Sequence, residues 1–325
     1  MSKAGSAARR VCVLGGSGFV GQRIASALVQ AGFRVRIPTR NRERNRRLLV
    51  LPGVELLNAD VHDGAALLRL VDGCDAVINL VGILNERPRN GRGFYRAHVE
   101  LVEKAVAACL DCGVERFLHM SALKANAEHG PSHYLRSKGA GERALKSLAG
   151  DGVQFTIFQP SVIFGPGDSF TNLFARLVKP FPVIPLVRPE ARFAPVFVGD
   201  VARAFCTALS DHTTAGNTYQ LCGPEIFSLR EIVAEIAKAI GKKRLIVGLP
   251  DPLGRIQAWL MDYVVPGRIL TIDSFKSLAV ASVCTENGMA ALGIQPTSMR
   301  VVLPGYLRAS PHQRTLSDYR QRASR

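Results

Sequence analysis

The chain of 325 residues has 42 Lys and Arg against 26 Asp and Glu, giving a formal net charge of +16 at pH 7. Its 47% hydrophobic and 21% charged residues are typical of a globular protein and exclude a wholly disordered chain. No apolar run approaches the ~18–20 residues of a membrane span, and the polar N-terminus lacks a signal peptide's apolar region. Seven cysteines, an odd number, do not suggest a disulfide framework; reduced thiols in a cytosolic compartment fit better.

The first two-thirds of the chain alternates short apolar runs with amphipathic segments of helix length, as in βαβ units with a parallel sheet. The expected strands are continuous apolar runs, typical of strands covered on both faces: Val11–Leu14, Phe33–Ile37, Val54–Leu57, Ala76–Val81, Phe117–Met120 and Gln154–Phe158. Between them we expect helices at Gly18–Gln30, Gly64–Val71, Phe94–Cys112 and Ser132–Ala149. Gly32 and Gly113 stand just past two of these helices, where left-handed cap residues are common.

The pattern changes after Pro160. Prolines cluster between residues 166 and 195, which favours loops and short edges over another βαβ unit. An amphipathic helix follows at Leu229–Ile240, with Ser228 and Glu231 as a capping box; a second apolar stretch is Ile256–Val265. We predict an α/β fold: a Rossmann-type doubly wound parallel sheet (1–165 and 195–222), a smaller C-terminal α+β lobe (166–194 and 223–310) and a basic, mobile tail (311–325).

A glycine-rich turn directly follows the first expected strand. Gly15, Gly18 and Gly21 have the spacing G-x-x-G-x-x-G and open a helix. Such glycines make a tight turn and let the backbone approach a pyrophosphate, which then lies at the positive end of the helix. The strand–turn–helix context at the start of a βαβ chain therefore predicts a dinucleotide site.

The end of the second strand bears on the choice of nucleotide. An NAD site usually has an acid there for the ribose hydroxyls, but this strand ends in Thr39-Arg40-Asn41-Arg42. Seven arginines and one acid, Glu43, fall between Arg34 and Arg47. A guanidinium forms bidentate, charge-assisted bonds to phosphate, so we expect Arg40 and a neighbour to bind the 2′-phosphate of NADP. The arginines from Arg44 onward are better interpreted as a solvated helix start.

A Ser–Tyr–Lys set follows the glycine turn. Tyr134 and Lys138 are four residues apart on one face of a predicted helix, and Ser121 ends the strand before it. A phenol with a pKa of about 10 is a poor acid or base at neutral pH. The Lys138 ammonium, with an oxidised nicotinamide nearby, is expected to lower the pKa of Tyr134, so that Tyr134 exchanges a proton with a substrate oxygen.

These features together resemble an extended short-chain dehydrogenase/reductase. Further matching stretches are Asn58–Val61, Asn79–Gly82, Pro160–Pro166 and Phe197–Ala202. The resemblance implies Ser121, Tyr134 and Lys138 as catalytic residues, Asp60 at the adenine amino group, and no metal. The residues it implies for nucleotide binding are Gly15, Ser17, Gly18, Phe19, Val20, Gly21, Thr39, Arg40, Asp60, Val61, Leu80, Val81, Gly82, Lys138, Pro160 and Val162.

Within that superfamily the chain most resembles an atypical branch that includes the NADPH-binding accessory subunit of respiratory complex I. The supporting stretches are Val81–Leu84, Tyr134–Glu142 and Leu292–Leu307. Nucleotide-sugar epimerases and dehydratases usually have Arg-Pro where this chain has Gln159-Pro160, which argues against a nucleotide-sugar substrate. Ser161, Phe164 and Phe170 indicate a comparatively apolar pocket, or else core packing.

Several other sequence features indicate a function less strongly. Cys109 and Cys112 form a lone pair without a second pair at zinc-ligand spacing, so we interpret them as structural. His98, His119, His129 and His133 are scattered without ligand spacing, and His133 is interpreted as a surface residue. The arginine-flanked loop Pro88–Gly93 could cover the site or meet a partner. The segment Leu253–Val265 fits lobe core better than an interfacial helix.

We therefore expect an NADP(H)-binding oxidoreductase that prefers NADP(H) to NAD(H) and acts on a carbonyl or carbinol carbon. One alternative is a non-catalytic NADPH-binding subunit of a respiratory or quinone-handling membrane complex, and a second is a nucleotide-sugar epimerase or dehydratase. The expected location is cytoplasmic, with a peripheral position on the inner membrane left open. A nucleotide explains little of the charge, so an acidic protein or anionic membrane surface stays open as a partner, whereas nucleic acid lacks a supporting motif.

Overall fold

The computed structural model describes residues 9–86, 89–254 and 271–308. Its central feature is a sheet of seven parallel strands: β1 (Arg10–Leu14), β2 (Arg34–Thr39), β3 (Val54–Asn58), β4 (Ala76–Asn79), β5 (Arg116–Met120), β6 (Gln154–Pro160) and β11 (Thr218–Leu221). Their order is β11-β6-β5-β4-β1-β2-β3, so the order reverses between β1 and β4. The predictions for Ile256–Val265 and for the tail from Pro311 lie outside the described residues.

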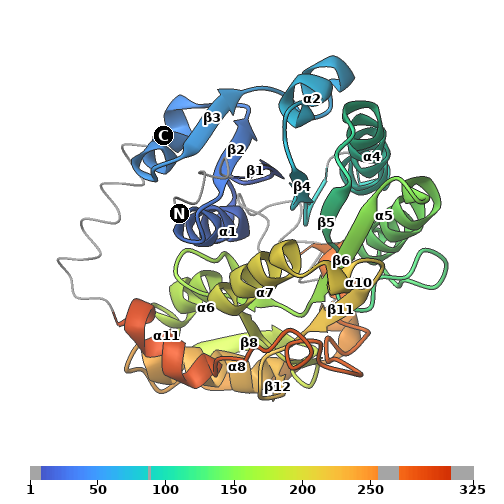
Figure 1. Cartoon of the computed structure of the whole chain (residues 1–325). Helices are drawn as coiled ribbons and strands as arrows, with labels where there is room; N and C mark the ends of the chain where they lie inside the picture. The colour runs from blue at the N-terminus through green and yellow to red at the C-terminus, as the bar shows by residue number, and fades with distance from the viewer. Residues whose placement is uncertain (1–8, 87–88, 255–270, 309–325) are drawn as a thin grey trace.

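Helices cover both faces of this sheet (Figure 1). On one face, α1 (Phe19–Gln30) packs against α7 (Val198–Ser210), and both contribute to a core with the apolar side chains of β1 and β2. On the other, α2 (Gly64–Val71), α4 (Leu101–Cys112) and α5 (His133–Ala149) bury a second core. The predicted Rossmann-type doubly wound sheet is thus confirmed.

The structure corrects several predicted boundaries. The helix expected at Phe94–Cys112 consists of α3 (Arg92–Tyr95), one π-helical turn, η2 (Arg96–Glu100), and α4. Strand β4 ends at Asn79 rather than Val81, because the Asn79 Oδ1 accepts the Val81 N–H at 3.1 Å and turns the chain out of the sheet. The arginine-rich stretch after β2 forms a 3₁₀ helix, η1 (Glu43–Val50), and β11 is an additional strand.

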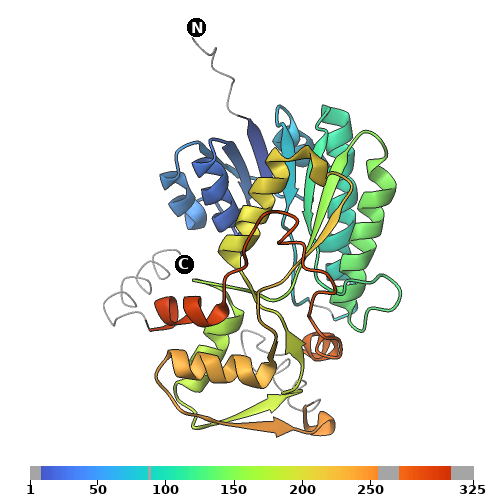
Figure 2. The same ribbon diagram turned by 60° about the horizontal axis from the view of Figure 1, so that its bottom comes forward.

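The remaining segments form a smaller lobe below the main sheet (Figure 2). Its helices are α6 (Phe170–Val178), α8 (Leu229–Ala239), α10 (Ile272–Ser277) and α11 (Met299–Leu307). Three two-stranded sheets pair β7 (Ile163–Phe164) with β10 (Val196–Phe197), β9 (Arg192–Phe193) with β12 (Phe227–Ser228), and β8 (Val183–Val187) with β13 (Leu245–Leu249). The capping box at the start of α8 is confirmed. Helix α6 was not predicted; it occupies a stretch of nine residues free of proline between Pro166 and Pro180.

One cysteine pair departs from the expected reduced thiols. Cys222, just after β11, forms a disulfide with Cys284, 62 residues further along the chain. Backbone hydrogen bonds between Ser282 and the strand β9 bring the two segments together. The sequence contains no spacing signal for such a pair because only the folding of the lobe makes the residues neighbours.

Among the described helices, none combines the length and the apolar character needed to cross a bilayer.

Candidate functional site

The residues predicted for nucleotide binding and catalysis lie at the carboxyl ends of the strands of the main sheet, on the turns that follow them, or at the starts of α1 and α5. Gly15–Gly21 follow β1, Arg40 follows β2, and Asp60 follows β3. Leu80–Gly82 follow β4 and Ser121 follows β5. Since the strands are parallel, these turns meet at one edge of the sheet, and β1 and β4 flank the point where the strand order reverses. Ligands of open α/β sheets bind at this position.

The glycine turn after β1 is built for close approach. Gly15 has a φ of +79°, and a Cβ there would lie 3.1 Å from the Leu80 carbonyl carbon. A Cβ at Gly21 would lie 2.4 Å from the Gly15 oxygen, so α1 starts directly against the turn. At Gly18, the N-cap of α1, a Cβ would meet only that same oxygen, at 3.3 Å. Gly18 therefore leaves open space in front of the helix N-terminus, which fits a pyrophosphate.

The structure divides the arginines around β2 into two kinds. Arg36 is a structural residue: its Nε donates to Glu55 at 2.9 Å, and its Nη1 donates to carbonyls at the end of α2, including those of Leu70 and Asp72. Arg40 is exposed at the tip of β2 and forms no ion pair within the described part of the chain. Its guanidinium is therefore available to an anion at this edge of the sheet.

Lys138 and Ser121 bring polar atoms together beneath the turn after β4. The Lys138 ammonium donates to the Met120 carbonyl at 2.9 Å, and a Cβ on Gly82 would lie 3.2 Å from its Nζ. Lys138 and Ser121 are each only 3% exposed. The Ser121 Oγ forms no hydrogen bond of good geometry among the described residues, although it interacts with the Glu142 carboxylate, whose pKa burial raises and this interaction lowers. This buried hydroxyl can therefore still turn to a substrate oxygen.

The protonation of the Tyr134–Lys138 pair differs from the sequence-based expectation. Burial raises the pKa of Tyr134 to about 12, and burial lowers the pKa of Lys138 to about 8. The protein's own groups therefore do not lower the pKa of Tyr134, because loss of hydration disfavours the phenolate. At neutral pH the phenol is protonated and can donate its proton.

His98, which has no metal-ligand spacing in the sequence, has a structural role beside the site. Its Nε2 accepts the Ile83 N–H at 3.1 Å, so the ring proton is on Nδ1 and is donated to the Ser137 Oγ at 2.7 Å. The Ser137 hydroxyl in turn donates to the Tyr134 carbonyl at 2.9 Å, and the His98 and Tyr134 rings meet edge to face. Burial first, then the positive charge of Lys138, lowers the pKa of His98 to about 2. This neutral histidine links the turn after β4 to helix α5.

The smaller lobe contributes to the same helix. Asp273 of α10 accepts the His133 N–H at 2.8 Å and the Tyr134 N–H at 3.1 Å, so its carboxylate caps the start of α5. The Ser277 hydroxyl donates to the N-cap residue Ser132 at 2.8 Å. The lobe thus fixes the end of α5 that carries Tyr134. Asp273 and Tyr134 are 139 residues apart, and no sequence pattern indicates their contact.

Other predicted features have structural roles. Ser161 and Phe164, put forward as pocket residues, are buried; the Ser161 Oγ donates to the Ser282 carbonyl at 2.7 Å. Phe170 packs against Phe174 and Phe193. The core-packing alternative is therefore the correct one for these side chains. Cys109 and Cys112, near the end of α4, are both free thiols, and Cys109 is buried. No cluster of metal-ligating side chains occurs among the described residues.

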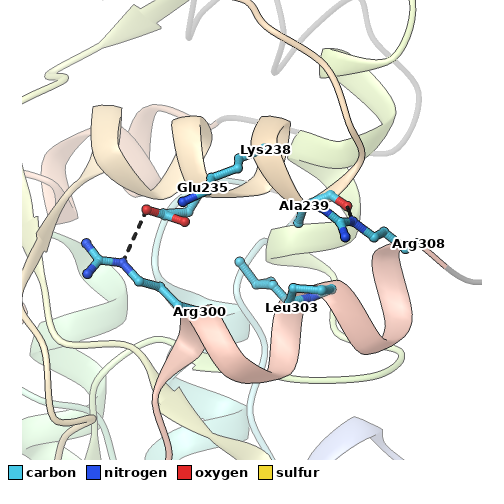
Figure 3. Close-up of a pocket in the computed structure, with 7 residues that line it drawn as sticks. Glu235, Lys238, Ala239, Arg300, Leu303 and Arg308 are labelled. Atoms are coloured by element: carbon cyan, nitrogen blue, oxygen red, sulfur yellow. Dashed lines mark hydrogen bonds and ion pairs between the residues drawn. The ribbon is translucent and has the colours of Figure 1, made fainter.

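Two hollows lie away from this edge. A cavity of about 90 Å³ lies between α8 and α11 (Figure 3). At this cavity Arg300 pairs with Glu235 at 3.2 Å, and Arg308 donates to the Ala239 carbonyl at 2.8 Å. These contacts pin the two helices together. The second hollow, at the opposite ends of β1, β2 and β3, includes Arg10 and Arg34. Neither hollow adjoins the Ser–Tyr–Lys set.

A doubly wound parallel sheet with a glycine turn at its switch point defines an NAD(P)-binding Rossmann-fold protein. Residues 11–222 match the NAD dependent epimerase/dehydratase family, and the chain belongs to this family.

Similar proteins carry different descriptions. The chain is 29% identical over 292 residues to the mitochondrial NADH dehydrogenase [ubiquinone] 1 alpha subcomplex subunit 9 of Arabidopsis thaliana, covering 85% of this chain and 71% of that protein. It is 31% identical over 252 residues to a ceramide reductase of Caulobacter vibrioides, covering 74% of each. The solved UDP-glucose 4-epimerase of Thermus thermophilus in complex with NAD superposes with a TM-score of 0.72 at 20% identity, covering 93% of this chain and 99% of that one. The last likeness shows the fold alone.

Proposed function

We propose that the protein is an NADPH-dependent reductase that converts the carbonyl group of an apolar, lipid-like substrate to an alcohol. The observation that carries the proposal is the arrangement at the end of β5: Ser121 with a buried hydroxyl that lacks a well-formed hydrogen bond, Lys138 held on the Met120 carbonyl, and Tyr134 on the same helix as Lys138. The 31% identity to a ceramide reductase supports a lipid-like substrate.

In this mechanism the bound nucleotide supplies a hydride to the carbonyl carbon. Ser121 donates a hydrogen bond that orients the carbonyl oxygen. Tyr134, protonated because burial raises its pKa to about 12, transfers its proton to that oxygen as negative charge develops. The Lys138 ammonium stabilises the resulting phenolate. Tyr134 is in the protonated form at neutral pH, which is the form that a proton donor in reduction requires.

NADPH is the proposed nucleotide because the tip of β2 presents Arg40, and no acid, at the place where the ribose is bound in this fold. A 2′-phosphate there would form charge-assisted hydrogen bonds to the guanidinium.

Replacing Tyr134 with Phe tests the reaction. Tyr134→Phe removes one oxygen, and we expect turnover of NADPH with long-chain aliphatic ketones to fall about 10²–10⁴-fold while NADPH binding is retained. Tyr95→Phe, at a 49% exposed tyrosine on α3, is the matched control and should keep full activity. Full activity in Tyr134→Phe would contradict the mechanism.

A second candidate is a non-catalytic nucleotide-binding subunit of a membrane complex, favoured by the 29% identity to the Arabidopsis thaliana subunit. NADPH that stays bound and reduced in the presence of ketones and quinones, together with co-purification of a membrane complex, would favour this candidate.

A further inference from the structure

The two-stranded sheet of β8 and β13 has one covered and one open face. Ile184 and Leu186 of β8 are buried in a cluster with Leu229 and Val233 of α8. Successive side chains of a strand point to opposite faces, so the residues between them point away from α8. In Figure 2 this sheet lies at the edge of the lobe away from the main sheet.

The open face is apolar. The register places Val183 opposite Leu245 and Pro185 opposite Val247. Val183 is 45% exposed, Leu245 63% and Val247 41%, and Phe181 in the turn before β8 is 54% exposed. We call these five residues the β8–β13 patch. Grouped apolar side chains at this exposure mark a surface that meets a partner.

Positive charge borders one end of the patch. Because β8 and β13 are parallel, the turns that lead into them lie at the same end of the sheet. These turns carry Lys179, Lys242 and Lys243, all exposed and without ion pairs in the described part of the chain. The acids next to the two strands, Glu190 and Asp251, lie beyond the opposite end of the sheet and pair with Arg230 and Arg188.

The charge decides between partners. A second copy joined through this patch would bring a further set of lysines, and the acids beside its patch, Glu190 and Asp251, are already in ion pairs with Arg230 and Arg188. A bilayer with anionic lipids offers apolar chains for the patch and phosphates for the lysines, whose long stems lie along apolar surface while the ammonium reaches the head groups. We propose that the β8–β13 patch is a membrane-contact surface for anionic phospholipids. The inference is independent of the proposed reaction.

Co-sedimentation of the full chain with lipid vesicles tests the proposal. The wild-type protein should bind vesicles of phosphatidylcholine mixed with phosphatidylglycerol, and should bind pure phosphatidylcholine at least about tenfold more weakly. The double variant Leu245→Ser, Lys243→Glu should lower the partition coefficient on the anionic vesicles by at least about tenfold, since it removes apolar contact and reverses one charge.

The matched control is Leu68→Ser, Arg69→Glu on α2, which exchanges one exposed leucine and one exposed cation for the same side chains elsewhere. It should bind like the wild type. Both variants keep the basic segment 309–325, so the comparison isolates the patch, and equal thermal unfolding temperatures establish that both fold. Failure of the wild type to bind anionic vesicles, or equal losses in the two variants, would overturn the proposal. Binding of polyglutamate, but not vesicles, that depends on Lys243 would overturn it too and assign the patch to an acidic protein.

Discussion

At the scale of single residues, the site depends on a buried pair of charged groups one helical turn apart. Burial lowers the pKa of Lys138 to about 8, and the Glu142 carboxylate, four residues on, partly offsets this. Burial likewise raises the pKa of Glu142, whose two oxygens both accept hydrogen bonds from Gln159, at 2.8 and 3.0 Å. The ammonium on which Tyr134 depends is therefore present at neutral pH and lost in mildly alkaline solution.

This pair predicts the pH dependence of reduction. Activity should decline as pH rises through about 8, because Lys138 loses its proton there while Tyr134, with a pKa of about 12, keeps its own. Glu142→Gln removes the charge that raises the pKa of Lys138, so the decline should move to lower pH. The measurement is kcat against pH, with the exposed Glu115→Gln as control. An unchanged profile in Glu142→Gln would show that Lys138 does not set the decline.

Sequence patterns reveal residues whose chemistry depends on local spacing. Gly15, Gly18 and Gly21 serve one turn, and Tyr134 and Lys138 share one helix face, so their placement could be predicted. His98 could not, because its role follows from burial and from a hydrogen bond to Ile83 on another segment. The same holds for the direction of the Tyr134 pKa shift, which burial determines.

At the scale of elements, helix α5 is fixed at its start by two different segments. Ser132 accepts the Leu135 N–H at 3.1 Å as an ordinary N-cap. Asp273 adds a carboxylate from α10 that accepts two further N–H groups and places negative charge at the positive end of the helix. The orientation of Tyr134 is thereby coupled to the docking of the smaller lobe.

Removing this second cap should affect both stability and activity. Asp273→Ala should lower the free energy of unfolding by about 1–2 kcal/mol, the usual effect of losing a capping side chain, and should also lower kcat/KM for reduction. Asp63→Ala is the matched control, since Asp63 caps α2 through the N–H groups of Ala65 and Ala66. It should show a similar loss of stability with full activity. Equal activities of the two variants would show that the contact between Asp273 and α5 does not affect the site.

The elements that could be predicted are those stabilised by their own periodicity and caps. Gly64–Val71 and the capped helix after Ser228 agree with the structure. The π turn at Arg96–Glu100 was missed because the sequence there reads as regular helix. Strand β11 was missed because it is short and gains its stability by pairing with β6.

At the scale of the whole molecule, the surplus of positive charge divides among separate surfaces. Arg36 is used internally, whereas Arg40 lies at the nucleotide edge of the sheet. The lysines around the β8–β13 patch belong to the smaller lobe, whose β8–β13 sheet lies on the side away from the main sheet (Figure 2). The net positive charge is therefore distributed over at least two separate basic surfaces, one at Arg40 and one at the β8–β13 patch. We propose that they bind different anions.

The measurement that tests the proposed nucleotide site most directly is titration of the protein with NADPH and with NADH. We predict tighter binding of NADPH, and a loss of about 10–100-fold in NADPH affinity in Arg40→Ala, the usual effect of removing a hydrogen-bonded charge, with NADH affinity unchanged. Arg34→Ala, at the opposite end of the same strand, should leave both affinities unchanged. Equal affinities for NADPH and NADH in the wild type, or an Arg40→Ala variant that still prefers NADPH, would contradict the account.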